Sequence, residues 1–391
     1  GISPLTDPFP ERNGARFEAP VGNALGLLAK TGMGWTFLAY DVPRSRQQRW
    51  RMDVQRQIGA NMMVSLGYAG SYSDNVKITK KLDSLPGQYW ATGATRDDAL
   101  ATNLNRNVTN PYYLNNFSAL QSSSPVLYQA LTSRGFFTSP TIRKNQLLRP
   151  FSQMNGLSRS WTPEGEVKTH SFEATFQRRF AGGFTLNAGY TGLWERDRDF
   201  YYNEFDPLPS WRQTNNGVPH RISATGIYEL PFGKSKPLAR TGVWNALFGG
   251  WQVAAAYEWQ PGPLLDWGNA FYSGNLGDIN TGTRTLDRWF NTSGFERGAR
   301  MVPAAFHARV FPQRVDGLRA DGLDRMDTNL QREFKLRESL VLQLRMDALN
   351  VFNRSQFAAP NRDPVSTNFG RVTNNTSSTM RYLLFQVRLK F

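Results

Sequence analysis

The sequence contains no cysteine, only three histidines and no long uninterrupted apolar segment. The absence of cysteine rules out disulfides and thiolate metal sites. Without a stretch of about 18 apolar residues, a transmembrane helix is excluded. A transmembrane β-barrel is not excluded, because its strands alternate apolar and polar residues and average out as polar. The mean hydropathy of −0.50 is therefore compatible with such a barrel.

Acidic residues are outnumbered by basic ones, with 31 Asp and Glu against 46 Lys and Arg and a net charge of +15. A large positive charge can indicate nucleic-acid binding. Here, however, the basic residues are spread along the whole chain, without a zinc-finger, RNP-like or heptad pattern. We therefore predict no nucleic-acid partner.

The common catalytic and metal-binding patterns do not occur in the sequence. His170, His220 and His307 fit no H-E-x-x-H or other metal spacing, and neither G-x-S-x-G nor a phosphate-binding glycine loop occurs. His170 and Ser171 are neighbours in a predicted strand, so their side chains point to opposite faces. The sequence thus predicts no enzyme, no cofactor and no metal ion.

The segment "ADGLDRMD" contains Asp321, Asp324 and Asp327, which could bind Ca²⁺ at an outer loop. Their spacing is not that of an EF-hand. Solvated carboxylates at the start of a strand are the favoured interpretation.

Alternating segments are what the sequence does contain. In the last eleven residues, Leu383, Phe385, Val387, Leu389 and Phe391 share one face, opposite Leu384, Gln386, Arg388 and Lys390. About nine strands of this kind are expected, at residues 47–58, 62–72, 171–180, 184–195, 219–230, 249–260, 325–334, 339–349 and 379–391. The polar faces carry Glu, Asp, Arg and Gln, which suit a water-filled lumen better than a sandwich interior.

The predicted connections alternate between short and long. Tight turns are expected at 59–61, 181–183 and 335–338, and the 231–248 link is expected on the same, periplasmic side. Residues 1–45 and the structureless connections 73–165, 196–217, 262–324 and 350–378 are expected outside the cell. The sequence therefore predicts an all-β, antiparallel transmembrane barrel over residues 1–391, located in a bacterial outer membrane as a multi-pass protein.

Aromatic residues recur on the apolar face at a spacing that fits a membrane. Phe184 and Trp194 are separated by roughly 33 Å of strand, which at a tilt near 40° projects to about 25 Å, the height of the apolar band. The predicted membrane-facing and girdle residues are Trp50, Tyr68, Phe180, Phe184, Trp194, Tyr228, Trp251, Trp259, Phe334, Phe385 and Phe391. Arg56, Arg178 and Arg332 recur two residues before a strand's last apolar residue, where they could extend to lipid phosphates or lie at an ordinary solvated strand end.

The direction of the first strand bears on completeness. Bacterial outer-membrane barrels have an even number of strands and both termini on the periplasmic side. Here the first strand runs toward a short turn, which places residues 1–45 outside. We therefore expect at least one further strand upstream and a chain that is the C-terminal portion of a barrel.

Several stretches carry a resemblance to a known family. They are Trp50–Arg56 with "LGYAGSYS", "VPHRISATGIYELPFGK", "FGGWQVAAAYEWQPG", "DRWFNTSGF", "MDTNLQREF", "LQLRMDALNVFNRSQFAAPN" with "FGRVT", and "RYLLFQVRLKF". In order and spacing the chain resembles the C-terminal barrel of TonB-dependent outer-membrane receptors, in particular the Oar-like group with a carboxypeptidase-regulatory-like N-terminal domain. The N-terminal domain, TonB box and plug of that family are absent here.

The resemblance implies a set of partners. These are the lipid and lipopolysaccharide of the outer membrane, the TonB–ExbB–ExbD complex through the missing N-terminal part, the barrel assembly machinery through the last strand, and a transported ligand such as a siderophore, oligosaccharide or peptide. Three alternatives remain open: an Oar-like adhesion or structural barrel without transport, a plain porin, and a secreted all-β binding module.

Candidate ligand-binding residues lie in the predicted loops. Residues 198–213 include Tyr201, Tyr202, Trp211 and Arg212, where aromatic rings beside Arg could hold a sugar, an aryl group or an anion. Packing within the loop, or a place in the outer girdle, is the alternative. Trp161 and Trp267 have the same two interpretations.

Overall fold

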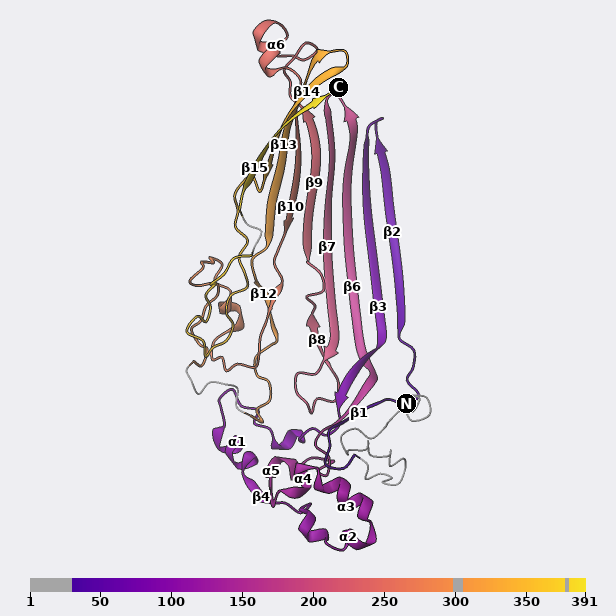
Figure 1. Ribbon diagram of the computed structural model, residues 1–391, viewed down its shortest axis with the longest axis vertical. Coiled ribbons are helices and arrows are strands. Elements are labelled where there is room, and N and C mark those ends of the chain that lie inside the picture. Colours follow the sequence, from indigo (N-terminus) through magenta and orange to yellow (C-terminus); the bar gives the residue numbers. More distant parts are fainter. Residues whose placement is uncertain (1–29, 298–304, 377–379) are drawn as a thin grey trace, which may run out of the picture. The chain divides into compact units, whose positions relative to one another are not determined.

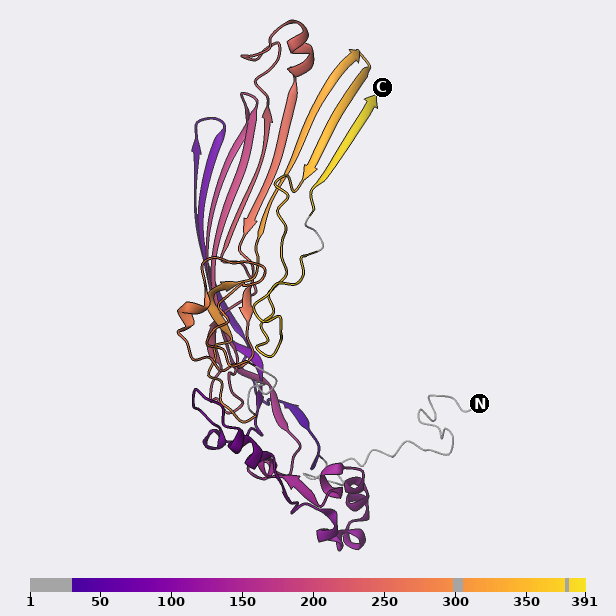
Figure 2. The same cartoon turned by 90° about the vertical axis from the view of Figure 1, so that its left-hand side faces the viewer.

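Nine long strands form one sheet in the computed structural model, which describes residues 30–297, 305–376 and 380–391. They are β2 (Arg46–Ile58), β3 (Met62–Lys81), β6 (Leu157–Ala181), β7 (Phe184–Phe200), β9 (His220–Glu229), β10 (Trp251–Gln260), β13 (Leu323–Arg337), β14 (Leu340–Leu349) and β15 (Tyr382–Lys390). Each strand neighbours the next along the chain, with β2 and β15 at the two edges (Figures 1 and 2). The predicted number of main strands and their up-and-down order are confirmed.

The short turns lie where the sequence predicts them. Gly59 follows β2, and Gly182 and Gly183 join β6 to β7, all three with φ between +63° and +82°. Residues with a Cβ rarely adopt this left-handed backbone conformation, so glycine permits the tight reversal of the chain. Two residues, Glu338 and Ser339, separate β13 from β14.

The strand register aligns the apolar side chains on one face. Phe334 is opposite Leu342, which in turn is opposite Leu389. Tyr228 is opposite both Phe184 and Val253. Residues directly opposite each other share a face, so the apolar rows of single strands join into one surface. Many of its side chains are exposed, among them Phe385 at 75%, and leaving such a surface in water would cost about 25 cal/mol per Å².

Three strands extend well beyond their predicted ends at the long connections, and β13 extends by two or three residues at each end. β3 continues to Lys81, β6 already begins at Leu157, and β7 continues to Phe200. Their extra residues are mostly polar, and apolar residues such as Val76, Ile78 and Val167 are too sparse to give a sustained alternation, so periodicity detects these extensions poorly. The connection between β3 and β6 is correspondingly shorter than the predicted 73–165.

The chain divides into two compact units, and the smaller one contains the described residues up to Asp41, residues 79–90 and residues 97–161. The prediction of structureless connections is wrong for this unit. It contains β1 (Trp35–Leu38), η2 (Gly87–Tyr89), α1 (Asp98–Asn105), β4 (Asn107–Thr109), η3 (Leu114–Phe117), α2 (Leu120–Ser123), α3 (Pro125–Thr132), α4 (Gly135–Thr138), β5 (Thr141–Arg143) and α5 (Lys144–Leu147). Leu114, Leu127, Leu131 and Phe137 form its core. β1 pairs with the start of β6 in parallel, whereas the nine long strands are antiparallel.

The larger unit contains residues 42–78, 91–96 and the described residues from 162 to 391, and with them most of the main sheet. Its connections carry β8 (Ser210–Gln213), α6 (Gly242–Phe248), β11 (Leu264–Asp266), η4 (Leu276–Ile279) and β12 (Arg314–Arg319). A second apolar core lies in the connections predicted to be structureless, around Trp267, Phe290, Phe311 and Phe369. Of the predicted outer segments, residues 1–29, 298–304 and 377–379 lie outside the described residues.

In the part of the chain that the structure describes, no helix is both long and apolar enough to cross a membrane.

Candidate functional site

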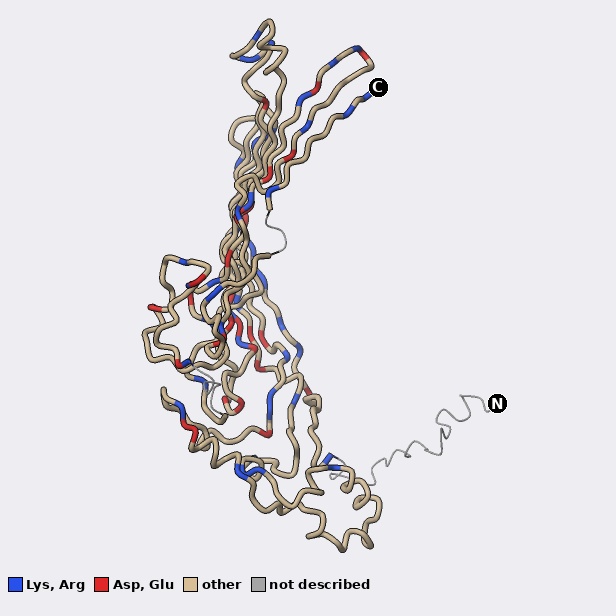
Figure 3. Tube along the Cα trace, turned by 60° about the vertical axis from the view of Figure 1, so that its left-hand side comes forward, with Lys and Arg blue, Asp and Glu red and all other residues tan. Residues whose placement is uncertain are grey.

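The face of the sheet opposite the apolar surface is lined with charged and amide side chains. Its ion pairs join Arg51 to Asp53 (2.6 Å) and to Glu173 (3.3 Å), Arg221 to Glu258 (2.6 Å), and Arg345 to Asp347 (2.9 Å). Figure 3 shows both signs of charge interleaved along the strands. Such a face is suited to water and to polar solutes, as the sequence predicts for a lumen.

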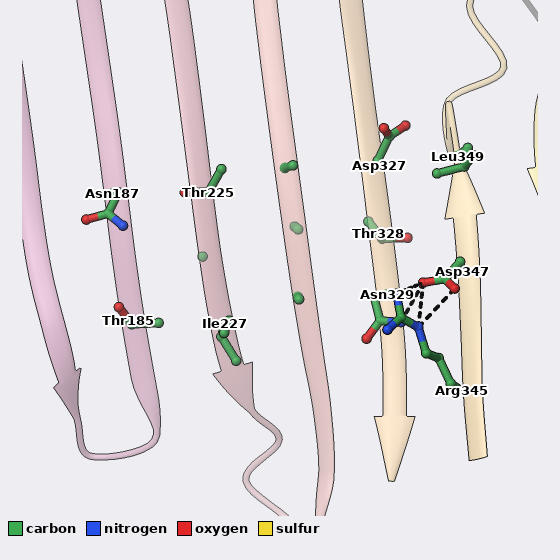
Figure 4. Close-up of a pocket in the computed structure, with 14 residues that line it drawn as sticks. Thr185, Asn187, Thr225, Ile227, Asp327, Thr328, Asn329, Arg345, Asp347 and Leu349 are labelled. Carbon is green, nitrogen blue, oxygen red and sulfur yellow. Dashed lines mark hydrogen bonds and ion pairs between the residues drawn. The ribbon is translucent and has the colours of Figure 1, made fainter. Parts of the chain in front are cut away.

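A hollow of about 410 Å³ lies on this polar face (Figure 4). The small residues Ala254 and Ala256 of β10 form its floor, because they leave the space that longer side chains would fill. On the β13–β14 side, Asn329 donates a hydrogen bond of 2.6 Å to Asp347, which also accepts one of 2.9 Å from Arg345.

On the β7–β9 side of the hollow, Thr185, Asn187 and Thr225 offer hydroxyl and amide groups. The arrangement can donate to and accept from a hydroxyl-rich or anionic solute. Sequence analysis did not single out this hollow. The run Ala254–Ala256 in a strand otherwise rich in large residues is the available signal.

Trp211 is one of the predicted binding residues, and the structure places it between two cations. Lys168 Nζ lies 4.7 Å and Arg198 Cζ 5.7 Å from the centre of its indole ring. Arg198 also pairs with Glu166 at 3.1 Å, and the Tyr72 hydroxyl donates to the same carboxylate at 2.9 Å. An aromatic residue beside Arg is therefore present, but the arginine is Arg198, not the predicted neighbour in sequence.

The alternation of β6 and β7 places these side chains on the same face of the sheet as the apolar residues. They lie farther along that face than Trp194, toward the long connections. The cluster of Tyr72, Glu166, Lys168, Arg198 and Trp211 therefore lies at the end of the apolar surface, not on the polar face.

Arg212 itself is engaged by the protein. Its guanidinium contacts Asp197 at 2.8 Å and Asp199 at 2.6 Å, hydrogen-bonds to Gln313, and lies 5.0 Å from the Phe200 ring centre. These contacts fix β8 against β7 and occupy the groups that an anion would need.

The two predicted tyrosines are also engaged. Tyr201 donates to Glu164 at 2.6 Å, and the Tyr202 ring lies 5.6 Å below the guanidinium of Arg309. The predicted set is therefore divided among several contacts and does not form one pocket with Trp211.

Trp267 was predicted as a loop aromatic available to a ligand, and its position corrects this. It is 3% exposed, and the ring centres of Phe290, Phe295 and Phe311 lie 5.0, 5.4 and 5.3 Å away. A ring enclosed in this way stabilises the loop core. Trp161 is 48% exposed and belongs to the smaller compact unit.

The predicted membrane-facing residues lie on the strands as expected from their alternation, and this role remains a prediction. Trp50, Tyr68, Phe180, Trp194, Tyr228, Phe385 and Phe391 are exposed, whereas Phe184, Trp251, Trp259 and Phe334 are half-buried.

Two histidines each form a hydrogen bond to a tyrosine on the apolar face. The Tyr68 hydroxyl lies 2.7 Å from His170 Nδ1, and the Tyr190 hydroxyl lies 2.8 Å from His220 Nδ1, with the rings stacked in both pairs. Sequence analysis missed these pairs, because their partners are separated by 102 and 30 residues.

The three aspartates considered for Ca²⁺ have separate partners. Asp321 accepts from the Phe357 amide at 2.8 Å, Asp324 pairs with Arg354, and Asp327 pairs with Arg325 at 2.9 Å. Among the described residues, no group of three or more histidine or acidic side chains is arranged to hold a metal ion.

Residues 2–386 match the sequence model of a family described as "Outer membrane beta barrel domain". Because the match covers nearly the whole chain, the protein belongs to this family. It is an outer-membrane protein, and the sheet is part of the wall of a β-barrel.

Among solved structures, the chain is similar to three outer-membrane proteins. The transporter YddB from Escherichia coli shares 14% identity over 92% of this chain and 34% of its own, with a TM-score of 0.39. The ferripyoverdine receptor of Pseudomonas aeruginosa shares 12% identity over 89% of this chain and 27% of its own, with a TM-score of 0.35. The FrpB iron transporter from Neisseria meningitidis shares 10% identity over 90% of this chain and 32% of its own, with a TM-score of 0.36.

The chain thus spans about a third or less of the length of these proteins. No curated protein sequence matches it.

Proposed function

We propose that this chain is the C-terminal part of the barrel of a TonB-dependent outer-membrane receptor, which imports a scarce or bulky ligand. The observation that carries the proposal is the folded state of the long connections. The core around Trp267, Phe290, Phe311 and Phe369 makes the described residues 264–297 and 305–320 an ordered assembly instead of a set of solvated loops. Ordered outer connections are what ligand capture requires, because recognition needs side chains held in place.

The length of β7 supports the same proposal. A transmembrane β-strand needs about 9–11 residues, and β7 has 17, so the hairpin continues beyond the lipid. The polar hollow at Asn329, Arg345 and Asp347 offers a ligand a second set of contacts inside the barrel. The energy for release would come from the TonB–ExbB–ExbD complex acting through an N-terminal plug, and β15 would be the strand recognised by the barrel assembly machinery.

The outward cluster at Trp211 is proposed to contact lipopolysaccharide. Lys168 and Arg196 are exposed, and among the described residues neither has a carboxylate within ion-pair distance. Lys168 lies over the Trp211 and Tyr72 rings, and Arg196 is its neighbour across the β6–β7 pair. Two cations without counterions, directly beyond the apolar surface, suit the phosphates of the outer leaflet.

Uptake measurements test the transport proposal. The full-length protein is expressed in cells with and without a functional TonB complex, and import of iron-loaded siderophores, maltodextrins and a peptide digest is measured. We expect import of one class to need both the protein and TonB. If none of these classes is imported, and the protein instead changes cell-to-cell or cell-to-surface adhesion, transport is wrong and the adhesion barrel replaces it.

A further inference from the structure

Helix α6, between β9 and β10, exposes an apolar face at the short-turn end of the sheet (Figure 1). Val243, Trp244, Leu247 and Phe248 are 71%, 66%, 57% and 46% exposed. Their spacing places them together on one face of the helix, and the rings of Trp244 and Phe248 are stacked with centres 5.8 Å apart. An apolar cluster of this size on a surface indicates an interaction site.

The helix is fixed to the lipid-facing side of the sheet. Arg332 of β13 donates a hydrogen bond of 2.8 Å to the Leu247 carbonyl, and the Trp251 indole N–H donates to the same oxygen at 3.0 Å. Arg332 also lies 4.0 Å from the centre of the Phe334 ring. Trp251, Arg332 and Phe334 all occupy the apolar series of their strands, so the C-terminus of α6 rests at the rim of the membrane-facing surface.

These contacts also explain the role of Arg332. Sequence analysis expected this side chain to extend to lipid phosphates or to end in solvent. It is instead buried, and its positive charge meets the unpaired carbonyls at the C-terminal end of a helix, where the helix dipole is negative. Gly249 directly follows α6. A Cβ there would lie 2.7 Å from the Asn245 carbonyl oxygen, so glycine allows the chain to pass this close to the end of the helix.

The residues around α6 are basic. Between Glu229 and Glu258 the chain contains Lys234, Lys236 and Arg240 and no acidic residue. Lys236 pairs with Glu229 at 2.6 Å, which leaves Lys234 and Arg240 as an excess of positive charge in the segment that leads into α6. An apolar helix face flanked by cations is the pattern of helices that lie in the interface of an anionic membrane.

We propose that α6 is an interfacial helix that lies in the phospholipid headgroup region of the leaflet at the short-turn rim. Trp244, Leu247 and Phe248 enter the boundary between headgroups and acyl chains, while Lys234 and Arg240 contact lipid phosphates. The occupant is thus an anionic phospholipid monolayer, continuous with the lipid that covers the sheet. This inference depends on membership of the barrel family and not on transport.

The absence of cysteine from this chain makes a direct test possible, with any cysteine in the rest of the full-length protein replaced by serine. Single-cysteine variants Leu247→Cys on α6, Ser235→Cys in the preceding loop and Val387→Cys on β15 of the full-length protein carry a nitroxide label. Each is refolded into vesicles of phosphatidylethanolamine and phosphatidylglycerol, and folding is checked by heat-modifiable gel mobility. Power saturation with oxygen and with a water-soluble nickel chelate then reports the depth of each label.

We expect the label at 247 to be reached by oxygen more than by nickel, at a depth of about 5–10 Å. It should lie deeper than the label at 235 and shallower than the label at 387. Replacing phosphatidylglycerol by phosphatidylcholine should make it shallower, and an unchanged depth would overturn the anionic preference.

Two results would overturn the proposal as a whole. If the label at 247 is as accessible to nickel as the label at 235, the helix face is solvated. If it is protected from both reagents and shows spin–spin broadening that increases with protein density, a second copy of the chain covers the helix.

Discussion

Arg51 of β2 and Glu173 of β6 form an ion pair of 3.3 Å although β3 lies between their strands. The residue of β3 beneath this contact is Gly67, which is opposite Asp53. A Cβ on Gly67 would lie 2.6 Å from Asp53 Oδ1 and 3.8 Å from Arg51 Nη2. The missing side chain therefore allows the two outer strands to interact over the middle one.

Gly67→Val should disrupt this contact. The added side chain displaces the Asp53 carboxylate, which orients Arg51. We therefore expect a small but measurable decrease in the temperature of unfolding, which is measured by heat-modifiable gel mobility. Gly189→Val is the matched control on the same polar face, because a Cβ there meets only Ser223 Oγ at 3.4 Å. Asp53→Ala in the Gly67→Val background makes room for the valine. A decrease equal to that of the control would contradict this account.

Reversing the charge of Lys168 should weaken binding to lipopolysaccharide. A cation near an anionic membrane surface contributes about 1 kcal/mol, so Lys168→Glu should reduce the gain in thermal stability on moving the protein from phosphatidylglycerol to lipopolysaccharide bilayers. Lys335→Glu, on the polar face at the short-turn end of β13, is the control and should leave that gain unchanged. Equal effects of the two variants would show that net charge, not position, is responsible.

Trp267→Ala should loosen the outer connections without unfolding the sheet. Removing a buried Trp costs about 3–5 kcal/mol, whereas Trp267→Phe keeps most of the packing and removes an indole N–H that has no hydrogen-bond partner among the described residues. Limited proteolysis within residues 264–320 measures the change, and heat-modifiable mobility should persist. If Trp267→Ala resists cleavage as the unmodified protein does, the aromatic cluster does not hold this region together.

The smaller compact unit should lose stability as the pH rises. Asp83 is fully buried, and burial raises the pKa of its carboxyl group, which the amide of Phe151 (3.2 Å) and the charge of Arg149 (3.9 Å) only partly offset. Because the folded-state pKa lies above the unfolded one, the folded unit binds the proton more tightly. Stability is then greatest below the unfolded pKa and falls as the pH rises through the raised value.

The urea concentration at which residues 97–161 become sensitive to protease, compared at acid and neutral pH, measures this dependence. Asp83→Asn, which cannot ionise, should lose it. A midpoint that decreases toward acid pH in the unmodified protein would reverse the sign and refute the assignment to Asp83.

The sequence by itself determined the sheet. A period of two fixes which side chains share a face, and glycines at Gly59 and Gly182–Gly183 mark where the chain reverses, so the nine strands and the apolar surface follow from local rules alone. Membership of the outer-membrane barrel family agrees with the expectation drawn from this pattern.

Only the tertiary structure decided what the remaining residues do. Tyr68 meets His170 because the strand register brings together residues far apart in sequence, and Trp267 is buried because four phenylalanines from distant segments converge on it. Similarly, Arg332 caps α6 instead of extending to lipid, because the link before β10 folds back over the rim. Contacts of this kind depend on long-range packing, which leaves no periodic signal in the chain.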